Sequence, residues 1–513
     1  MIGEEMSTNT VKKIKLNFIF GLLAQVISLL VGIIVPRLFI VNYGSEVNGY
    51  INSINQIFVY VALLEAGVGS AAVYSLYAPV GSDDKNKING ILSATNKYYT
   101  RTGFLYLSIV IVLSFVYPLL IETALPYYLM VGIFLINGGS GVVAYFFHAK
   151  YKLLLGVDGR SYVTSAVSSI YQVLLSLGKA IFLLLGFHIF LVQGLYVGLN
   201  LLQAVIFGIY VKKTYPWLNT KAAPDNAAIS KSKNALIHQI SGLVFNNTDV
   251  LILTFFCNLK IVSVYALYKT LMGLVGTLIN HFTSSVTFKL GQTFKNRERF
   301  IKLFDAYETF HISLTFSLCT VAYILFLPFL RLYTEGMDAN YLLTYMPLLI
   351  VLAEVLSFVR LPSQDVITFA GHFKETQWRS VIESAINLSV SLILVVVFER
   401  LWGLGIYGVI IGTVAALFYR TNDILIYTNK RLLNRSPWGV YKTCIINVVI
   451  SAGVIFGYNI IDPTLNGYIP VIFTAIILCV IIVPISLISS LASNKNARTF
   501  LINLIKTRVS PKR

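Results

Sequence analysis

Ionisable side chains stand deep inside apolar stretches of this sequence. Glu65 lies in "LLEAGVGSAAVYSLY" (Leu63–Tyr77), and Lys179, Asp249 and Lys269 lie in other apolar runs. Because an ionised group is costly in hydrocarbon, such residues normally face the interior of a helix bundle or a water-filled cavity. We therefore take these four residues as candidates for a functional role or for a buried pair.

Helical spacing places polar residues beside three of these charges. On the face that carries Lys179, the sequence also places Gln172, Ser161, Ser165, Ser168 and Ser176. Asp249 ends a series at helical spacing that contains His238, Gly242 and Asn246. Lys269 shares a face with Gly273, Gly276, Asn280, Thr283 and Thr287. Small and hydroxyl residues at this spacing also occur where membrane helices pack, so the stripes alone leave both interpretations open.

Glu65 lies near the middle of its predicted helix. Its helical face also carries the small residues Ala62, Gly69 and Ala72, which allow another helix to approach closely. A buried glutamate must be neutral, hydrogen-bonded or paired with a cation. Arg37 is a candidate partner, and it follows Pro36, which predicts a bend in the first helix. The alternative for Arg37, near the outer helix end, is that its side chain reaches the membrane surface.

Other charged residues lie nearer the predicted inner membrane surface. They are Asp305, Glu308, Arg360, Glu383, Arg420 and Asp423. We expect interfacial anchoring to be their main role. Three scattered histidines, His238, His281 and His311, give no metal-binding spacing. We therefore expect no metal site and no cofactor.

The composition is that of an all-α integral membrane protein. Of 513 residues 56% are hydrophobic and 12% are charged, and the mean hydropathy is +0.75, whereas soluble domains carry about a quarter charged residues. Apolar runs long enough to cross a bilayer recur along the whole chain and predict about fourteen helices. They begin near residues 16, 49, 102, 127, 161, 189, 235, 261, 304, 341, 379, 404, 443 and 468.

The placement of basic residues predicts the orientation. The net charge of +18 could suggest nucleic acid, but most of the 40 lysines and arginines cluster in alternate loops, as in proteins oriented by cytoplasmic positive charge. The predicted outer loops are short and hold only Lys260, Arg331 and Arg400. We therefore expect no nucleic-acid partner and a multi-pass membrane protein with both termini in the cytoplasm.

A polar segment, Lys212–Asn234, divides six predicted helices from eight. We predict an N-terminal lobe over 1–220, a C-terminal lobe over 221–435, and two additional helices with a basic tail over 436–513. The segments Val47–Glu65 and Val262–Asn280 both open with Val-x-x-Tyr. Six helices in each lobe would make the two lobes a parallel pseudo-repeat.

The polar residues within the predicted helices indicate the kind of cargo. Lysine and arginine beside hydroxyl and amide groups suit a substrate with anionic and sugar-like parts. The acidic residues need a separate reason, and coupling to Na+ or H+ is one.

Two segments resemble the polysaccharide (O-antigen and capsule type) flippases of the multidrug/oligosaccharidyl-lipid/polysaccharide (MOP) exporter superfamily. They are Asn48–Val80, followed by the basic "KINGILSA", and Asn246–Phe256, followed by "VSVYALYKTLMGLV". The stretch Glu65–Ala72 is the most specific part. The resemblance implies a MATE/MOP-like fold in the bacterial cytoplasmic (inner) membrane that moves an undecaprenyl-pyrophosphate-linked glycan to the outer leaflet by alternating access. It favours a monomer and is compatible with association with polysaccharide polymerase machinery.

By analogy with the cationic cavity of that family, Arg37, Lys179 and Lys269 are the candidate substrate contacts. Two alternatives within the superfamily stay open, a lipid II flippase and a cation-coupled multidrug or metabolite antiporter. A membrane glycosyltransferase is disfavoured because outer loops of at most about ten residues do not form a catalytic domain.

Overall fold

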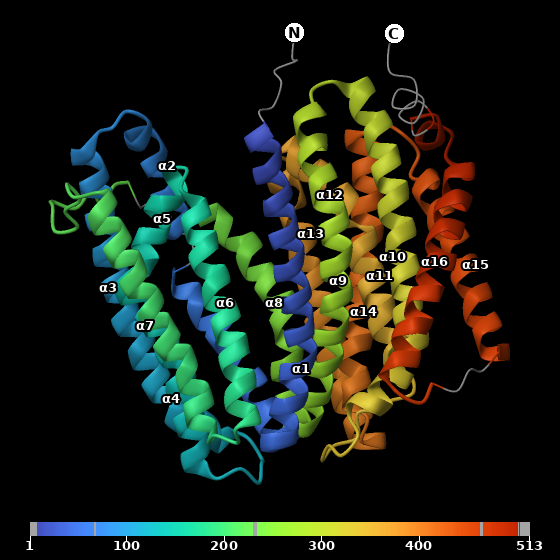
Figure 1. The fold of residues 1–513 in the computed structure, drawn as a ribbon, viewed down its shortest axis with the longest axis horizontal. Coiled ribbons are helices and arrows are strands. Elements are labelled where there is room, and N and C mark those ends of the chain that lie inside the picture. The colour runs from blue at the N-terminus through green and yellow to red at the C-terminus, as the bar shows by residue number, and fades with distance from the viewer. Residues whose placement is uncertain (1–7, 66–67, 229–232, 462–464, 501, 503–513) are drawn as a thin grey trace. The chain divides into compact units, whose positions relative to one another are not determined.

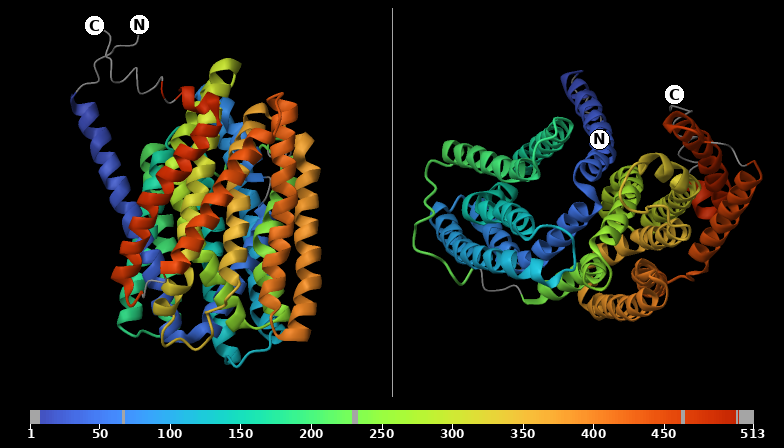
Figure 2. Two further views of the ribbon diagram at one scale, coloured as in Figure 1. Left: turned by 90° about the vertical axis from the view of Figure 1, so that its right-hand side faces the viewer. Right: turned by 90° about the horizontal axis from the view of Figure 1, so that it is seen from below.

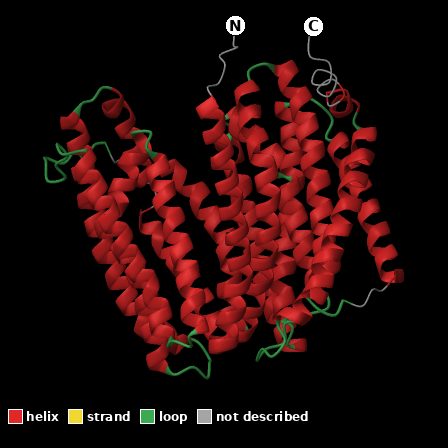
Figure 3. Ribbon diagram, in the orientation of Figure 1, coloured by secondary structure: helices red, strands yellow, loops and turns green. Residues whose placement is uncertain are grey.

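The structure is a computed structural model that describes residues 8–65, 68–228, 233–461, 465–500 and 502. Side chains are described from residue 31 onward within these ranges, except at 65, 68, 70, 233–239, 284, 285 and 288. The described residues form helices joined by short loops, and none of them lies in a strand (Figure 3). The chain divides into two compact units, Met1–Lys233 and Asn234–Arg513.

The first unit comprises the helices that run from blue to green in Figure 1. Its elements are α1 (Thr8–Val61), η1 (Ala62–Glu65), α2 (Val68–Gly81), α3 (Lys85–Val116), η2 (Tyr117–Leu120), α4 (Tyr127–Val143), η3 (Ala144–His148), α5 (Ala149–Val157), α6 (Ser161–Leu184) and α7 (Ile189–Thr214). α4 packs against α3 and α7, and α6 packs against α1 and α7. α4, η3 and α5 follow one another without a loop, so they form one long helix that contains a π-helical segment.

α1 is broken within its length at Gly44. This residue has φ 84° and ψ 166°, so the 54-residue element is two helices that meet there. Glycine suits this position because it adopts positive φ without steric cost. The sequence predicts a bend at Pro36 instead, but the only non-helical backbone inside α1 is at Gly44.

The second unit holds the remaining helices, coloured from yellow-green to red. They are α8 (Lys233–Phe256), α9 (Leu259–Thr293), α10 (Arg297–Tyr333), α11 (Met346–Val359), α12 (Leu361–Ala370), α13 (Phe373–Trp402), α14 (Gly405–Tyr427), η4 (Thr428–Leu432), α15 (Trp438–Ile461) and α16 (Tyr468–Ser493). α13 and α14 approach closely at Gly412. A Cβ atom added to this glycine would lie only 2.7 Å from the backbone nitrogen of Ser391. Small residues allow such contact between membrane helices.

The last two helices pack on α10. Figure 2 (right) shows α15 and α16 in red at one edge of the second unit, and polar contacts tie them to α10. Ser490 of α16 accepts a hydrogen bond from Ser313 at 2.9 Å and another from Asn447 at 2.9 Å. Thr320 donates to Ser451 at 2.7 Å. These helices are therefore an integral part of the second unit.

The predicted fold class is confirmed. Among the described residues, eleven helices are long and apolar enough to cross a membrane, and Ile240–Phe256 is a shorter apolar helix. The two halves of α1 complete the about fourteen helices predicted from hydropathy. The lobe boundaries at 220 and 435 and the orientation of the termini stay predictions.

Candidate functional site

A stripe of polar side chains runs along α7 in the first unit. Tyr196, Asn200 and Gln203 follow one another at helical spacing, which places them on one face. The Asn200 amide donates to the hydroxyl of Tyr171 on α6 at 3.1 Å. Gln203 is only 5% exposed. The stripe thus faces other helices of its own unit.

Two lysine side chains end on this stripe. The ammonium group of Lys179 donates to the Tyr196 hydroxyl and lies 3.9 Å from the centroid of the same ring. The ammonium group of Lys152 donates to Oε1 of Gln203 at 3.2 Å and lies 5.4 Å from the Phe207 ring centroid. Both positive charges are therefore held by neutral groups.

The π-helical segment η3 lies just before Lys152 and ends at His148. Single-turn π segments inside α-helices are frequent at functional sites. His148 is 3% exposed, and neither ring nitrogen makes a hydrogen bond of normal geometry in the described part of the chain, although the ring interacts with the Asn200 side chain. Its ring centroid lies 6.0 Å from that of Phe207, so His148 and Lys152 meet at the same aromatic ring.

A third lysine continues the cationic character of this region. Lys150 donates to Oδ1 of Asn96 on α3 at 2.6 Å. Among the side chains that the structure describes, no carboxylate lies within 4.0 Å of the ammonium groups of Lys150, Lys152 or Lys179. The ion pairs in the described part of this unit are formed elsewhere, by Lys85–Asp83, Lys87–Asp84 and Arg160–Asp158.

These lysines lie in helices of membrane-spanning length. A buried charge without a counter-charge is unfavourable in a low-dielectric interior. Aromatic rings, amide oxygens and hydroxyl groups offset part of this cost. The arrangement has the capacity to bind an anionic group, which would supply a compensating negative charge.

An apolar pocket lies between α6 and α7 beside the stripe. It is lined by Val167, Ile170, Tyr171, Leu174, Leu199, Leu202, Gln203 and Ile206. Tyr171 and Gln203 belong both to this pocket and to the polar contacts described above. An amphiphile with an anionic head and an apolar chain would therefore find both kinds of surface side by side.

The second unit contains a buried carboxylate centre at Asp249. Asp249 is 4% exposed, and its Oδ2 accepts hydrogen bonds from Tyr265 at 2.6 Å and Thr413 at 2.9 Å. The amide of Asn387 donates to Oγ1 of Thr413 at 3.1 Å. Oδ1 of Asp249 and Oδ1 of Asn387 have no hydrogen-bond partner among the described residues. Such oxygens are suitable acceptors for a proton or ligands for a small cation.

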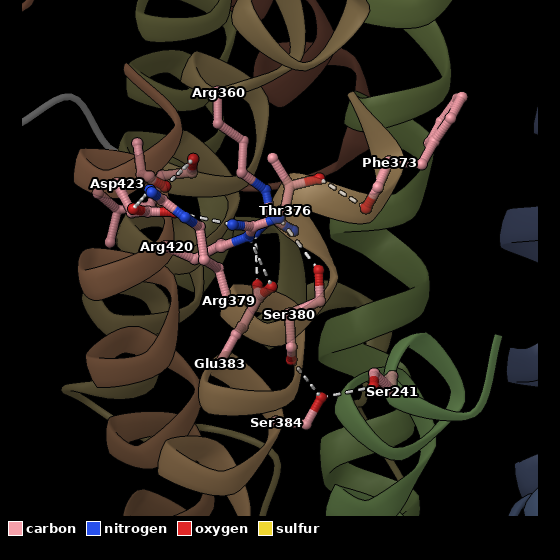
Figure 4. Close-up of polar contacts among 12 residues, drawn as sticks. Ser241, Arg360, Phe373, Thr376, Arg379, Ser380, Glu383, Ser384, Arg420 and Asp423 are labelled. Carbon is pink, nitrogen blue, oxygen red and sulfur yellow. Dashed lines mark hydrogen bonds and ion pairs between the residues drawn. The ribbon is translucent and has the colours of Figure 1, made fainter. Parts of the chain in front are cut away.

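A network of ion pairs joins the region between α11 and α12 to α13 and α14 (Figure 4). Glu383 Oε1 lies 2.5 Å from Arg360 Nη1, and Oε2 lies 3.4 Å from Arg420 Nε. Arg420 also pairs with Asp423 at 2.8 Å, and Asp423 pairs with Arg379. Because the side chains of Glu383 and Arg420 are 9% and 7% exposed, they are not interfacial anchors. For these residues the expectation of anchoring is wrong, and tertiary pairing is the reason.

The same correction applies to the acidic residues of α10. The Arg435 guanidinium pairs with Asp305 and, at 2.9 Å, with Glu308. The two carboxylates are 4% and 7% exposed. These ion pairs hold the segment before α15 against α10, so the two carboxylates do not anchor the protein at the membrane surface.

The structure brings together only some of the residues selected from the sequence. Lys179 joins the α7 stripe, and Asp249 lies in its own buried centre. Arg37 is half-buried on α1. Three others have exposed side chains and lie outside these two clusters, namely Gln172, Asn246 and Asn280. Lys269 is also exposed, but it lies one turn after Tyr265 on α9 and its positive charge acts on the carboxylate of Asp249. The side chains of Glu65 and His238 lie outside the described residues.

Sequence reasoning missed the lysines at 150 and 152. The apolar run that begins near residue 127 ends near residue 149, so hydropathy places both lysines in a loop, whereas the helix continues to Val157. The short series His148, Lys150 and Lys152 directly after an apolar run was the available signal. The direction in which the two lysine side chains point depends on the π-helical segment before them, and hydropathy does not reveal such a segment.

No protein-family model matches the chain, and no curated protein matches it. Solved structures do. The chain is similar to lipid II flippase MurJ in an inward closed conformation, with a TM-score of 0.63 and 16% identity over 91% of this chain and 98% of that one. It is similar to an inward-facing multidrug resistance MATE family transporter of the MOP superfamily, with a TM-score of 0.56 and 15% identity over 81% and 96%. It is also similar to the MATE multidrug transporter DinF-BH, with a TM-score of 0.55 and 12% identity over 84% of this chain and 99% of that one. At these identities the likeness concerns the fold.

Proposed function

We propose that this protein is a transporter of the MOP superfamily that moves a diphosphate-linked lipid oligosaccharide across the cytoplasmic membrane. The observation that carries the proposal is a group of three lysines in the first unit that have no neighbour among the carboxylate side chains that the structure describes. Lys150, Lys152 and Lys179 are held by amide, hydroxyl and aromatic groups. A diphosphate provides the negative charge that these groups lack.

The neighbouring groups fit the rest of such a substrate. Tyr171, Tyr196 and Asn200 offer hydroxyl and amide groups for sugars. The apolar pocket beside them suits the first part of a polyprenyl chain. In this account no covalent chemistry is required, the protein acts as a monomer, and both termini face the cytoplasm.

A lipid II flippase is the second candidate. The fold likeness to MurJ, named as a lipid II flippase, favours it. Lipid II carries the same diphosphate-linked polyprenyl chain, so the lysine cluster suits both cargoes equally. The resemblance of Asn48–Val80 to the polysaccharide branch is the reason that we favour the surface polysaccharide precursor.

Transport of organic cations fits the first unit less well. A cationic cargo would meet the ammonium groups of Lys152 and Lys179 with like charge, which is unfavourable. The carboxylate of Asp249 in the second unit is the feature that would serve a cation, and we assign it to coupling. In this proposal Asp249, Asn387 and Thr413 take up Na+ or H+.

Flipping in proteoliposomes tests the function. The purified protein is reconstituted with a fluorescent diphosphate-linked oligosaccharide lipid, and the fraction reached by a membrane-impermeant glycosidase is followed with time. We expect flipping by the wild type and a fall to the protein-free rate in Lys179→Met. The matched control is Lys213→Met, an exposed lysine at the end of α7, which should flip normally. Export of a lipophilic cation without movement of the glycolipid would overturn the proposal.

A further inference from the structure

We infer that the diphosphate group binds at two successive lysine stations along α7 rather than at a single site; this inference rests on the proposed function. The first, the Lys152 station, consists of Lys152, Gln203 and His148. The second, the Lys179 station, consists of Lys179 and Tyr196.

The spacing on α7 separates the two stations. Tyr196 and Gln203 are seven residues apart, which corresponds to about 10 Å along a helix. Each residue is bound to its own lysine, Tyr196 to Lys179 and Gln203 to Lys152. A diphosphate group is shorter than this separation along the helix axis, which favours separate contacts with the two ammonium groups.

The Lys152 station carries the stronger evidence of an unfilled binding role. His148 is 3% exposed, and neither ring nitrogen makes a hydrogen bond of normal geometry in the described part of the chain. The Asn200 side chain interacts with the ring but does not complete such a bond. Buried polar groups are nearly always hydrogen-bonded, so an unpartnered one needs an explanation. A phosphate oxygen close to Lys152 would accept a hydrogen bond from the histidine. The Phe207 ring lies beside both side chains.

Asn200 lies between the stations on the same helical face. It is four residues from Tyr196 and three from Gln203, and it donates to Tyr171 at 3.1 Å. The amide and the phenol offer neutral hydrogen bonds to an anion that leaves one lysine for the other. Weak intermediate contacts of this kind allow an ion to move on, because binding at several sites must not be too tight at any one of them.

Two stations predict an unusual pattern of affinities. If one ligand occupies either station with similar affinity, loss of one station lowers the total affinity only about twofold, and loss of both removes it. Flipping, in contrast, needs both stations. A single shared site would lose most of its affinity with either substitution, since a charge-assisted hydrogen bond contributes about tenfold to hundredfold in binding.

Farnesyl diphosphate binding to the purified full-length protein distinguishes these cases. The variants are Lys152→Met, Lys179→Met and the double variant, with Lys213→Met as control. Methionine keeps an unbranched apolar side chain and removes a half-buried charge, and the thermal unfolding midpoint of each variant confirms folding. If a methionine variant unfolds, the glutamine variant at the same position replaces it.

We expect each single variant to bind farnesyl diphosphate within about threefold of wild type and the double variant to bind at least about tenfold more weakly. Glycolipid flipping should fall at least about tenfold in each single variant, and Lys152→Arg should restore it because arginine retains the charge. Loss of binding in a single variant as large as in the double variant would refute two stations and leave the function intact. Normal flipping in both single variants would also refute them. Failure of the wild type to bind the diphosphate would instead refute the proposed function.

Discussion

Replacement of Glu383 by glutamine tests the assignment of the buried ion-pair network to stability. Glu383 is the carboxylate that pairs with Arg360 at 2.5 Å, and it also pairs with Arg420 at 3.4 Å. Arg420 keeps Asp423 at 2.8 Å after the substitution, whereas Arg360, 14% exposed, loses its counter-charge. Removal of one partner from a buried ion pair costs about 3–5 kcal/mol. Because one arginine retains a partner, we expect a loss of about 3 kcal/mol in the free energy of unfolding.

The assay is unfolding by SDS in mixed micelles, followed by tryptophan fluorescence. Glu375→Gln on the same helix is the control, because this glutamate is exposed, and its substitution should change the free energy by less than about 0.5 kcal/mol. The double variant Glu383→Gln, Arg360→Gln should recover part of the loss, since it removes both members of the pair. Equal unfolding midpoints for Glu383→Gln and the control would refute the reasoning.

Three further predictions concern other parts of the second unit. Gly412→Ala should lower the free energy of unfolding by about 1–3 kcal/mol, because the new Cβ atom meets the backbone of Ser391. The control is Gly453→Ala, whose new Cβ atom would have no neighbour within 4 Å, and it should not destabilise the protein in the same SDS titration. Asp249→Asn should leave farnesyl diphosphate binding unchanged and abolish the response of flipping to imposed Na+ and pH gradients; a response equal to wild type would contradict the coupling role. Arg435→Gln should lower the free energy of unfolding by about 3 kcal/mol, because two buried carboxylates lose their counter-charge; an unchanged SDS midpoint would contradict it.

Most of the helical architecture was predictable because a bilayer of fixed thickness sets helix length. The fourteen apolar runs correspond to helices, and α6 and α7 lie where hydropathy predicts them. Local backbone geometry was less predictable. The break in α1 occurs at Gly44, where positive φ is required, and glycine is too common in membrane helices to identify such a position.

The candidate site was predictable only where a charge lies deep in an apolar run. Lys179 and Asp249 met this condition. Lys152 did not, because its helix continues beyond the apolar run and the π segment changes the direction of the residues that follow it. The partners of Glu383 were also beyond reach, since Arg360 and Arg420 come from different parts of the chain. Proximity to the predicted membrane surface suggested anchoring, whereas tertiary packing buries these side chains.

The central claim is that the lysines of the first unit recognise a diphosphate. The most direct test compares the affinity of the wild-type protein for farnesyl diphosphate with its affinity for farnesol, which has the same chain without the charge. We predict that the diphosphate binds at least about a hundredfold more tightly and that this preference disappears when Lys150, Lys152 and Lys179 are all replaced by methionine. Equal affinities for the two compounds, or an unchanged preference in the triple variant, would contradict the account.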